Sequence, residues 1–327
     1  TQNFIGQLAF TVSPWFLWIM NSGKIFRDDA GEPDQVAGAA GLAIVIALVV
    51  IALGTLPAVF LRERMANVAE AELEAQSRPG LLKSLASFFA GFKTTIRSGP
   101  FMKLAVTAFL VFNGFMLVAS FQFYVIIYYV MQGNEAEGAK WAGIAGTVGA
   151  VANFAIVAFM AWWATRVGKK KALMVGITLS IVGYSLKWFC YNPEVPWLVI
   201  IPAPLISFGL GSLFTLIPSM IADVCDVDEL QTHERREGMY GSIFWWVIKL
   251  GMSLALVLSG YLLENTGFEV DLGAAQSART LTLMRLADVG VPVLTSLLAL
   301  WALSRFPITE AYAGQVRAQL EARRGKA

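Results

Sequence analysis

The chain has 327 residues, of which 57% are hydrophobic and only 15% are charged, and its formal net charge is +2. A soluble domain of this length carries about 25% charged residues, so the composition excludes an ordinary soluble protein and indicates one that spans a membrane several times. Two cysteines and one histidine provide neither a disulfide framework nor a histidine-rich metal site.

Eight apolar segments are long enough to span a bilayer, whose core requires about 20 apolar residues per helix. The first is short and contains Gln7 and Pro14. The third is too long for a perpendicular helix, so we expect it to tilt or to extend beyond the lipid. The sequence therefore predicts an all-α membrane protein with spans at 4–20, 36–61, 101–131, 141–164, 172–190, 197–222, 242–263 and 286–305.

One long connection, residues 62–100, divides these spans into two plus six. Its second half has apolar residues at helical spacing, namely Leu82, Leu85, Phe88, Phe89 and Phe92. This spacing predicts an amphipathic helix on the membrane surface, which is compatible with a plain linker between domains.

Lysine and arginine concentrate in alternate connections, at 62–100, at 165–171 and in the tail after 305. Cytoplasmic loops carry the excess of positive charge in membrane proteins. We therefore expect these three segments, and both ends of the chain, to lie in the cytoplasm.

Catalytic motifs are absent from the sequence: it contains no P-loop, nucleophile elbow or HExxH pattern. We therefore expect no enzyme and no ATP-driven pump. Polar residues inside spans are the candidates for function, because they are expensive in lipid. Lys249 lies about seven residues into its span, with Trp245, Trp246 and Ser253 within about one turn. These residues suit a lined cavity, and snorkelling toward the cytoplasm is the alternative.

Two other charged positions have structural interpretations. Lys187 is near the outer end of its span, beside Trp188 and Tyr191, where snorkelling into an aromatic belt explains it. Arg285 and Asp288 are three residues apart, so we expect them to pair on one helix face.

A polar and aromatic group occupies the 101–131 span, with Asn113, Ser120, Gln122, Tyr124, Tyr128 and Tyr129. Tyrosine rings stack on sugars and amides hydrogen-bond their hydroxyls. These residues therefore indicate a sugar site, although Tyr128 and Tyr129 equally suit interface anchors.

Proline and glycine mark two further spans. Pro202, Pro204 and Pro218 fall in the 197–222 span, where we expect kinks of the kind that line transporter binding sites. Glycines recur every three residues at Gly143, Gly146 and Gly149, a spacing typical of close helix packing that favours packing over a substrate path.

A cluster of both charge signs separates the 197–222 and 242–263 spans. It contains Asp223, Asp226, Asp228, Glu229, Glu234, Arg235, Arg236 and Glu237. Ion pairs among these residues would lock the cytoplasmic side, whereas in a solvated loop such pairs contribute little.

Five separated motifs carry a family resemblance. In chain order they are Arg166–Lys170, Met220–Asp223 with Asp226, Arg235–Met239, Lys249–Gly251 and Phe306–Glu310. Together they resemble the glycoside-pentoside-hexuronide:cation symporters, the melibiose-permease-like branch of the major facilitator superfamily.

The resemblance covers the whole chain and implies helices five to twelve of a twelve-helix transporter, truncated at the N-terminus. Residues 1–61 would then be the last two helices of the N-terminal half, and 62–100 the central cytoplasmic loop. Residues 101–310 would form the C-terminal six-helix bundle and 311–327 a cytoplasmic tail. The family's cation site lies mostly in its first four helices.

The resemblance also assigns residues. It implies a substrate and coupling role for Lys249, and we group with it Asn113, Gln122, Tyr124, Thr215, Trp245 and Trp246. It implies a cytoplasmic gate that we assign to Asp223, Asp226, Arg235, Arg236, Glu237 and Arg166. Two departures are Thr165, where the superfamily has aspartate, and Thr215, where melibiose permease has tryptophan.

We thus expect a monomeric transporter of the bacterial inner membrane that moves a sugar or glycoside with Na⁺ or H⁺ by alternating access. We expect the fragment alone not to transport, and we expect no resident metal, cofactor or nucleic acid. The alternatives are a membrane sensor with a transporter fold and a uniporter without cation coupling.

Overall fold

The computed structural model describes residues 35–60, 89 and 91–325. They belong to two compact units, one of which contains the helix α3 (Gln35–Phe60) and the other the residues from Gly91 onward. The helix α3 is apolar along its length and long enough to cross a membrane. The predicted span at 4–20 and most of the predicted amphipathic helix lie outside the described residues.

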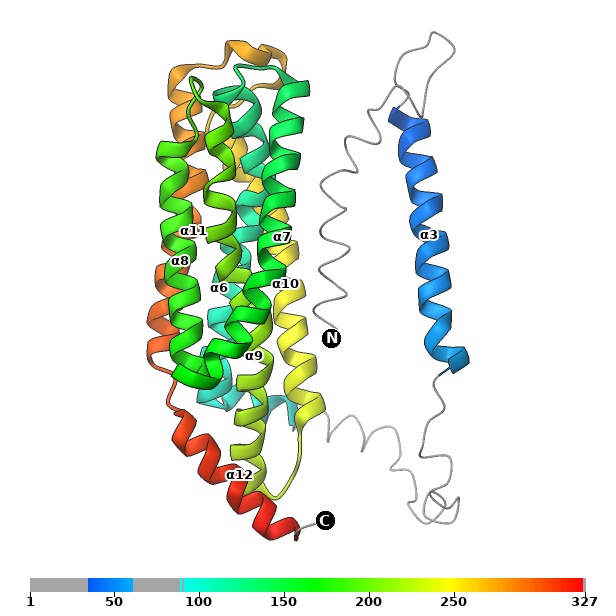
Figure 1. Cartoon of the computed structure of the whole chain (residues 1–327), viewed down its shortest axis with the longest axis vertical. Helices are drawn as coiled ribbons and strands as arrows, with labels where there is room; N and C mark the ends of the chain where they lie inside the picture. The colour runs from blue at the N-terminus through cyan, green and yellow to red at the C-terminus, as the bar shows by residue number, and fades with distance from the viewer. Residues whose placement is uncertain (1–34, 61–88, 90, 326–327) are drawn as a thin grey trace. The chain divides into compact units, whose positions relative to one another are not determined.

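The second unit is a bundle of six long helices connected by short links (Figure 1). They are α6 (Gly99–Tyr124), α7 (Glu135–Val167), α8 (Lys169–Cys190), α9 (Pro202–Thr232), α10 (Glu237–Asn265) and α11 (Ala278–Ser304). With α3, seven helices of the described chain are long and apolar enough to span a membrane, and the predicted all-α fold is confirmed.

Local chemistry explains where these helices begin and end. The side chains of Asn134 and Ser277 accept hydrogen bonds at the starts of α7 and α11, as N-cap residues do. Gly168 separates α7 from α8 at a φ of 89°, a conformation that glycine adopts without steric cost.

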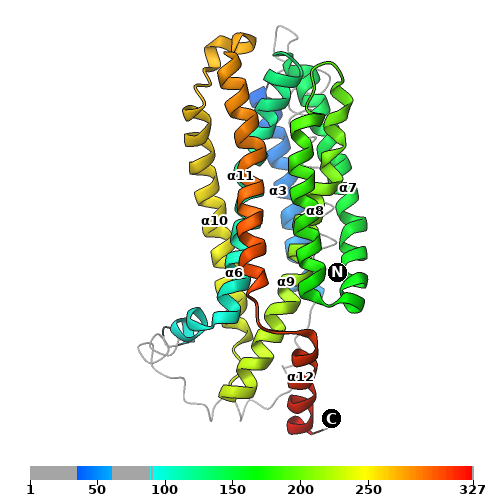
Figure 2. The ribbon, with the colours of Figure 1, turned by 90° about the vertical axis from the view of Figure 1, so that its left-hand side faces the viewer.

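The two ends of the bundle carry different segments of the chain (Figure 2). One end, here called the basic end, carries the lysine-rich start of α8, the 233–236 loop between α9 and α10, and the helix α12 (Glu310–Arg324). The opposite end carries three short helices, η3 (Val125–Val130), η4 (Pro196–Ile200) and η5 (Val270–Ala275).

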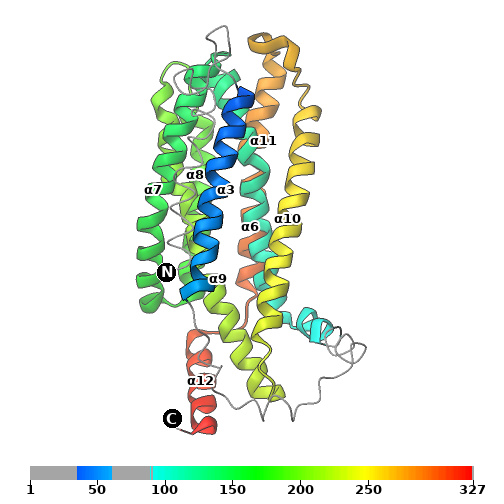
Figure 3. The ribbon, with the colours of Figure 1, turned by 90° about the vertical axis from the view of Figure 1, so that its right-hand side faces the viewer.

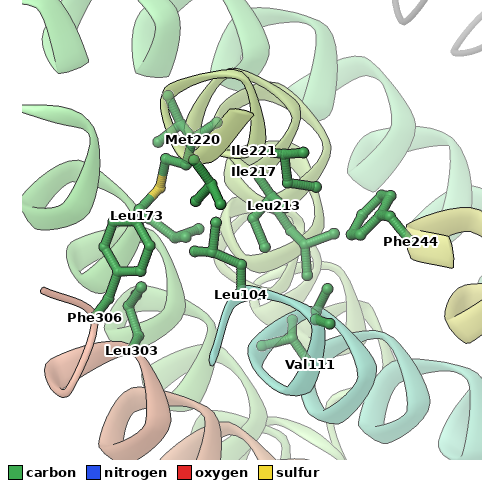
Figure 4. Close-up of a cluster of buried hydrophobic side chains, with 14 of the residues drawn as sticks. Leu104, Val111, Leu173, Leu213, Ile217, Met220, Ile221, Phe244, Leu303 and Phe306 are labelled. Carbon is green, nitrogen blue, oxygen red and sulfur yellow. The ribbon is translucent and has the colours of Figure 1, made fainter. Parts of the chain in front are cut away.

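Two apolar clusters fill the bundle. The larger joins all six helices to the segment before α12, and Figure 4 shows Leu104, Leu173, Leu213, Met220, Phe244 and Phe306 within it. The smaller lies nearer the opposite end and includes Phe121, Ile126, Tyr191 and Met284. Apolar burial of this kind fixes how the helices that carry the polar residues are placed.

Two sequence expectations change. The long 101–131 span is not one α-helix, because α6 ends at Tyr124 and continues as the π-helix η3. The prediction of kinks was wrong for Pro202 and Pro204: they lie in the first turn of α9, where a missing N–H costs nothing. Only Pro218 lies inside that helix.

The predicted glycine packing is confirmed at Gly149, where an added Cβ would lie 3.6 Å from Ala203 Cβ of α9. At Gly143 an added Cβ would meet nothing within 4 Å. The tighter contact is between α8 and α9, where a Cβ on Gly183 would lie 2.8 Å from the backbone nitrogen of Ile206.

We expect Gly183→Ala to lower the thermal midpoint of the detergent-solubilised protein. Alanine improves helix propensity by about 1 kcal/mol, but the new methyl group meets the backbone of α9, which cannot move aside cheaply. Gly260→Ala on α10 is the matched control, because nothing lies within 4 Å of its added Cβ. Equal midpoints for the two variants would contradict this packing.

Candidate functional site

A polar stripe runs along α10 on the side away from the bundle. The buried side of this helix includes Tyr240, Phe244, Ile248, Gly251 and Ala255. The exposed side chains of Ser242, Trp246, Lys249 and Ser253 are four, three and four residues apart, so they share one face at 3.6 residues per turn. Exposed apolar residues flank this stripe, with Leu250 and Val257 on one side and Met252 on the other.

Lys249 is therefore exposed in the described structure rather than surrounded by apolar side chains. Its ammonium group has no ion pair among the described residues. It thus presents a positive charge on the outer face of the six-helix bundle, halfway along an otherwise apolar helix.

The two tryptophans of α10 differ in their contacts. Trp246 is 57% exposed and lies on the polar stripe. Trp245 stacks on Phe214 of α9, with ring centroids 6.3 Å apart and 13° between the planes. Trp245 is thereby held on the bundle, whereas the ring of Trp246 is presented outward.

Asn113 lies at the contact between α6 and α10, two helices that Figure 3 shows side by side. Its side-chain amide donates to the carbonyl of Phe109 at 2.9 Å and packs directly against Gly251. A side chain at Gly251 would collide with this amide, which explains the glycine two residues after Lys249. Asn113 is buried and lies behind the polar stripe.

Gln122 and Tyr124 lie farther along α6, about 13 Å and 16 Å from Asn113 at 1.5 Å per residue. Gln122 accepts a hydrogen bond from Lys187 at 3.2 Å. Tyr124 stacks with Tyr128, and both rings contact Phe268 at centroid distances of 5.2 and 5.0 Å. The structure therefore divides the predicted substrate residues between the middle of the bundle and its opposite end.

Thr215 of α9 is half-buried, and its hydroxyl is buried without a hydrogen-bond partner among the described residues. It follows Phe214, the residue on which Trp245 stacks. This places Thr215 near the middle of the bundle.

At the basic end, Asp223 is the centre of an ion cluster. Its carboxylate accepts hydrogen bonds from Lys169 Nζ at 2.6 and 2.8 Å and lies 3.4 Å from Arg317 Nη2. It thus joins α9 to the start of α8 and to α12. A pocket of about 340 Å³ beside it is lined by residues including Lys169, Met220, Asp223, Phe306 and Glu310.

The loop between α9 and α10 forms its own ion pairs. Arg235 lies 2.9 Å from Glu237, 3.1 Å from Glu229 and 3.9 Å from Asp226. Arg236 pairs with Asp228 at 2.7 Å, and this hydrogen bond raises the pKa of the Arg236 guanidinium. Asp226 therefore has the longest contact to Arg235, and Glu229 and Glu237 the short ones.

Among the described residues, Arg166 does not join the ion cluster around Asp223. Its guanidinium packs over the ring of Trp162, one turn earlier on α7, at 4.7 Å. Of the basic turn at 166–171, the residue that pairs with Asp223 is Lys169. The sequence placed both residues in one basic turn but did not reveal which one points toward α9.

Sequence reasoning missed a buried ion pair. Lys187 Nζ of α8 lies 2.6 Å from Asp288 Oδ1 of α11, and both side chains are 1% exposed. The prediction that Lys187 snorkels was wrong, as was the expected pairing of Arg285 with Asp288. Removing one member of a buried pair costs about 3–5 kcal/mol. Two opposite charges in separate apolar spans were the available signal.

Arg285 instead contacts two aromatic rings. Its guanidinium lies 4.0 Å from the ring centroid of Tyr129 and 4.4 Å from that of Trp188. It also donates to the Tyr129 hydroxyl at 2.8 Å and to the Trp188 carbonyl at 2.6 Å. The tyrosine next to Tyr128 is therefore held at the bundle surface by an arginine.

The arrangement of long apolar helices with polar residues on one outer face is typical of transporters, and the comparison with known families agrees. The model of the family described as MFS/sugar transport protein matches residues 1–310. The chain belongs to this family. Membership confirms the resemblance read from the five motifs.

Three relatives illustrate the range of the family. The chain is 31% identical to an uncharacterized symporter of Synechocystis over 61% of its length and 37% of that protein. It is 30% identical to the isoprimeverose transporter of Lactiplantibacillus pentosus over 40% of its length and 27% of that protein. It is 28% identical to a sodium-dependent lysophosphatidylcholine symporter of Danio rerio over 74% of its length and 43% of that protein.

The chain spans less than half the length of these relatives. The family and its named members are membrane transporters, and several are symporters. The substrates that their names give, a sugar in one case and a lysophospholipid in another, differ in chemistry.

Proposed function

We propose that this chain forms part of a secondary active transporter that moves a sugar or glycoside together with a cation by alternating access. The observation that carries the proposal is the polar stripe of α10. A lysine facing hydrocarbon would be costly, so this face is better explained by a water-filled path at the interface with another bundle.

The chemistry of the stripe fits a hydroxylated substrate. Lys249 supplies three hydrogen-bond donors that hydroxyl oxygens can accept. Trp246, exposed four residues from Ser242 and three from Lys249, offers a ring face on which a sugar can stack. We assign substrate orientation, or response to cation occupancy, to Lys249.

The basic end would be cytoplasmic, because positive charge is retained on that side of the membrane. In this orientation the cluster around Asp223 and the pairs of Arg235 and Arg236 are the proposed inner gate. Each pair joins elements within the bundle or its C-terminal helix, so these pairs would hold α8, α9, α10 and α12 in the closed arrangement. Loss of the contacts would accompany opening.

The coupling ion in this proposal is Na⁺ or H⁺. Groups of three or more residues able to hold a metal are absent from the described part of the chain. The proposal leaves the residue that binds Na⁺ or H⁺ unassigned.

Uptake in proteoliposomes tests the function. We expect the full-length protein to accumulate a labelled sugar or glycoside when a Na⁺ or H⁺ gradient is imposed, and an ionophore to abolish accumulation. Counterflow without any effect of the gradients would identify a uniporter. Substrate binding without counterflow would identify a sensor, and either result would contradict symport.

A lysophospholipid is the competing substrate class, because the stripe of α10 is flanked by exposed apolar residues such as Leu250 and Val257. Labelled lysophosphatidylcholine should therefore be measured in the same vesicles. Cation-driven uptake of the lipid, with no sugar uptake, would replace the sugar in the proposal.

A further inference from the structure

Two cations connect the same three segments near the opposite end of the bundle. Lys187, on α8, contacts Asp288 on α11 and Gln122 on α6. Arg285, on α11, contacts Trp188 on α8 and Tyr129 on η3, which continues α6. Each cation thus comes from one segment and bridges the other two, and α11 packs against both α6 and α8.

The ammonium group of Lys187 has two hydrogen-bond acceptors and one aromatic neighbour. It donates to Asp288 at 2.6 Å and to Gln122 at 3.2 Å, and it lies 5.2 Å from the ring centroid of Tyr191. The pair is fully buried, and Tyr184 and Tyr191 beside it are buried as well. A saturated, enclosed pair of this kind suits a fixed structural contact better than a site that exchanges ions.

The bridges hold the part of α6 that carries the aromatic residues. Gln122 precedes Tyr124 by two residues, and Tyr129 directly follows Tyr128. The stacked rings of Tyr124 and Tyr128 are therefore placed between the two bridge contacts. The π-helix begins immediately after Tyr124, and this rare geometry is frequent at functional sites.

We propose that Lys187, Asp288 and Arg285 are positioning residues, which fix the end of α6 so that Tyr124 and Tyr128 keep a defined place against Phe268. This proposal rests on the proposed transport function, in which these rings would face the substrate at the outer end of the path. The effect of these residues on the position of α6 can be tested without measuring transport.

The test measures how close positions 124 and 268 lie to each other. Both are replaced by cysteine in the full-length protein, after Cys190 and Cys225 are changed to serine, and a short thiol cross-linker is added. Gln122→Leu removes the bridge to α6 but leaves the ion pair intact. Lys187→Met with Asp288→Leu removes the pair without leaving an unpaired charge, and replacing a buried pair by apolar residues of similar volume is often neutral for stability.

We expect the cross-linking rate to fall about 10-fold in both backgrounds, because the end of α6 loses one of its two bridges and keeps only that of Arg285 to Tyr129. The single variant Asp288→Asn should reduce the yield of folded protein sharply, since Lys187 is then buried without a counter-charge. Ser185→Ala is the matched control on α8, because among the described residues its exposed hydroxyl bonds only the carbonyl of Ile181, and it should leave the rate unchanged.

Unchanged cross-linking in Gln122→Leu and in the apolar double variant would overturn the positioning role. Transport adds an independent reading: in the variant Lys187→Met with Asp288→Leu, the substrate concentration for half-maximal uptake should rise, with little change in the maximal rate. If the wild-type protein transports no substrate at all, the proposed function fails, and the cross-linking result still decides the positioning role.

Discussion

Replacing Lys249 with alanine is expected to lower coupled uptake about 100-fold while leaving the amount of protein in the membrane unchanged. The side chain is exposed and has no ion pair among the described residues, so its loss removes no packing from the bundle. A hydrogen bond to a charged group contributes about 1.5–3 kcal/mol. A 100-fold decrease corresponds to about 2.7 kcal/mol, which is the loss of one or two such bonds to the substrate.

Two further variants make the result specific. Lys249→Arg keeps the charge but changes the geometry of its donors, and it should retain partial uptake. Lys140→Ala is the matched control: this lysine is also exposed, but it pairs with Glu137 at 3.2 Å near the start of α7. Normal coupled uptake by Lys249→Ala would show that the polar stripe of α10 is not part of the path.

The helices were predictable because their signal is local. Each run of about 20 apolar residues can only be a helix in lipid, and seven of the eight predicted spans are helices of the described chain. The boundary between α6 and η3 was not predictable, since a π-helix depends on contacts such as that between Ile127 and Gly138. Those residues belong to different helices.

The types of residue in the site could be predicted from the sequence, but which of them contact each other could not. The sequence contains the lysine of α10 and the acids of the 223–237 segment, but the choice of Lys169 over Arg166 depends on the turn at Gly168. The pair of Lys187 and Asp288 joins positions 101 residues apart. A single sequence does not show which residues contact each other. It did place both charges in apolar helices, where each charge requires a partner of opposite sign.

Asp223→Ala should destabilise the basic end and abolish accumulation of substrate against a gradient. The carboxylate is 6% exposed and forms ion pairs with both Lys169 and Arg317. Because Lys169 is partly and Arg317 largely exposed to solvent, we expect a cost of about 2 kcal/mol, below that of a fully buried pair. Without this carboxylate, α9 loses its charged contacts to α8 and α12, so the proposed inner gate would leak. Thermal midpoints and gradient-driven uptake measure the two effects.

Exchanging the charges of residues 169 and 223 distinguishes the effect of the ion pair from the effect of the carboxylate alone. Asp223→Lys combined with Lys169→Asp should recover much of the stability and part of the accumulation, because attraction between α8 and α9 is restored. Asp226→Ala is the matched control. Its only ion pair among the described residues is the 3.9 Å contact to Arg235, which keeps Glu229 and Glu237, so its effect should stay within about 0.5 kcal/mol. Equal losses from Asp223→Ala and Asp226→Ala would place the gate in the exposed loop, whereas a loss confined to Asp223 places it where α8, α9 and α12 meet.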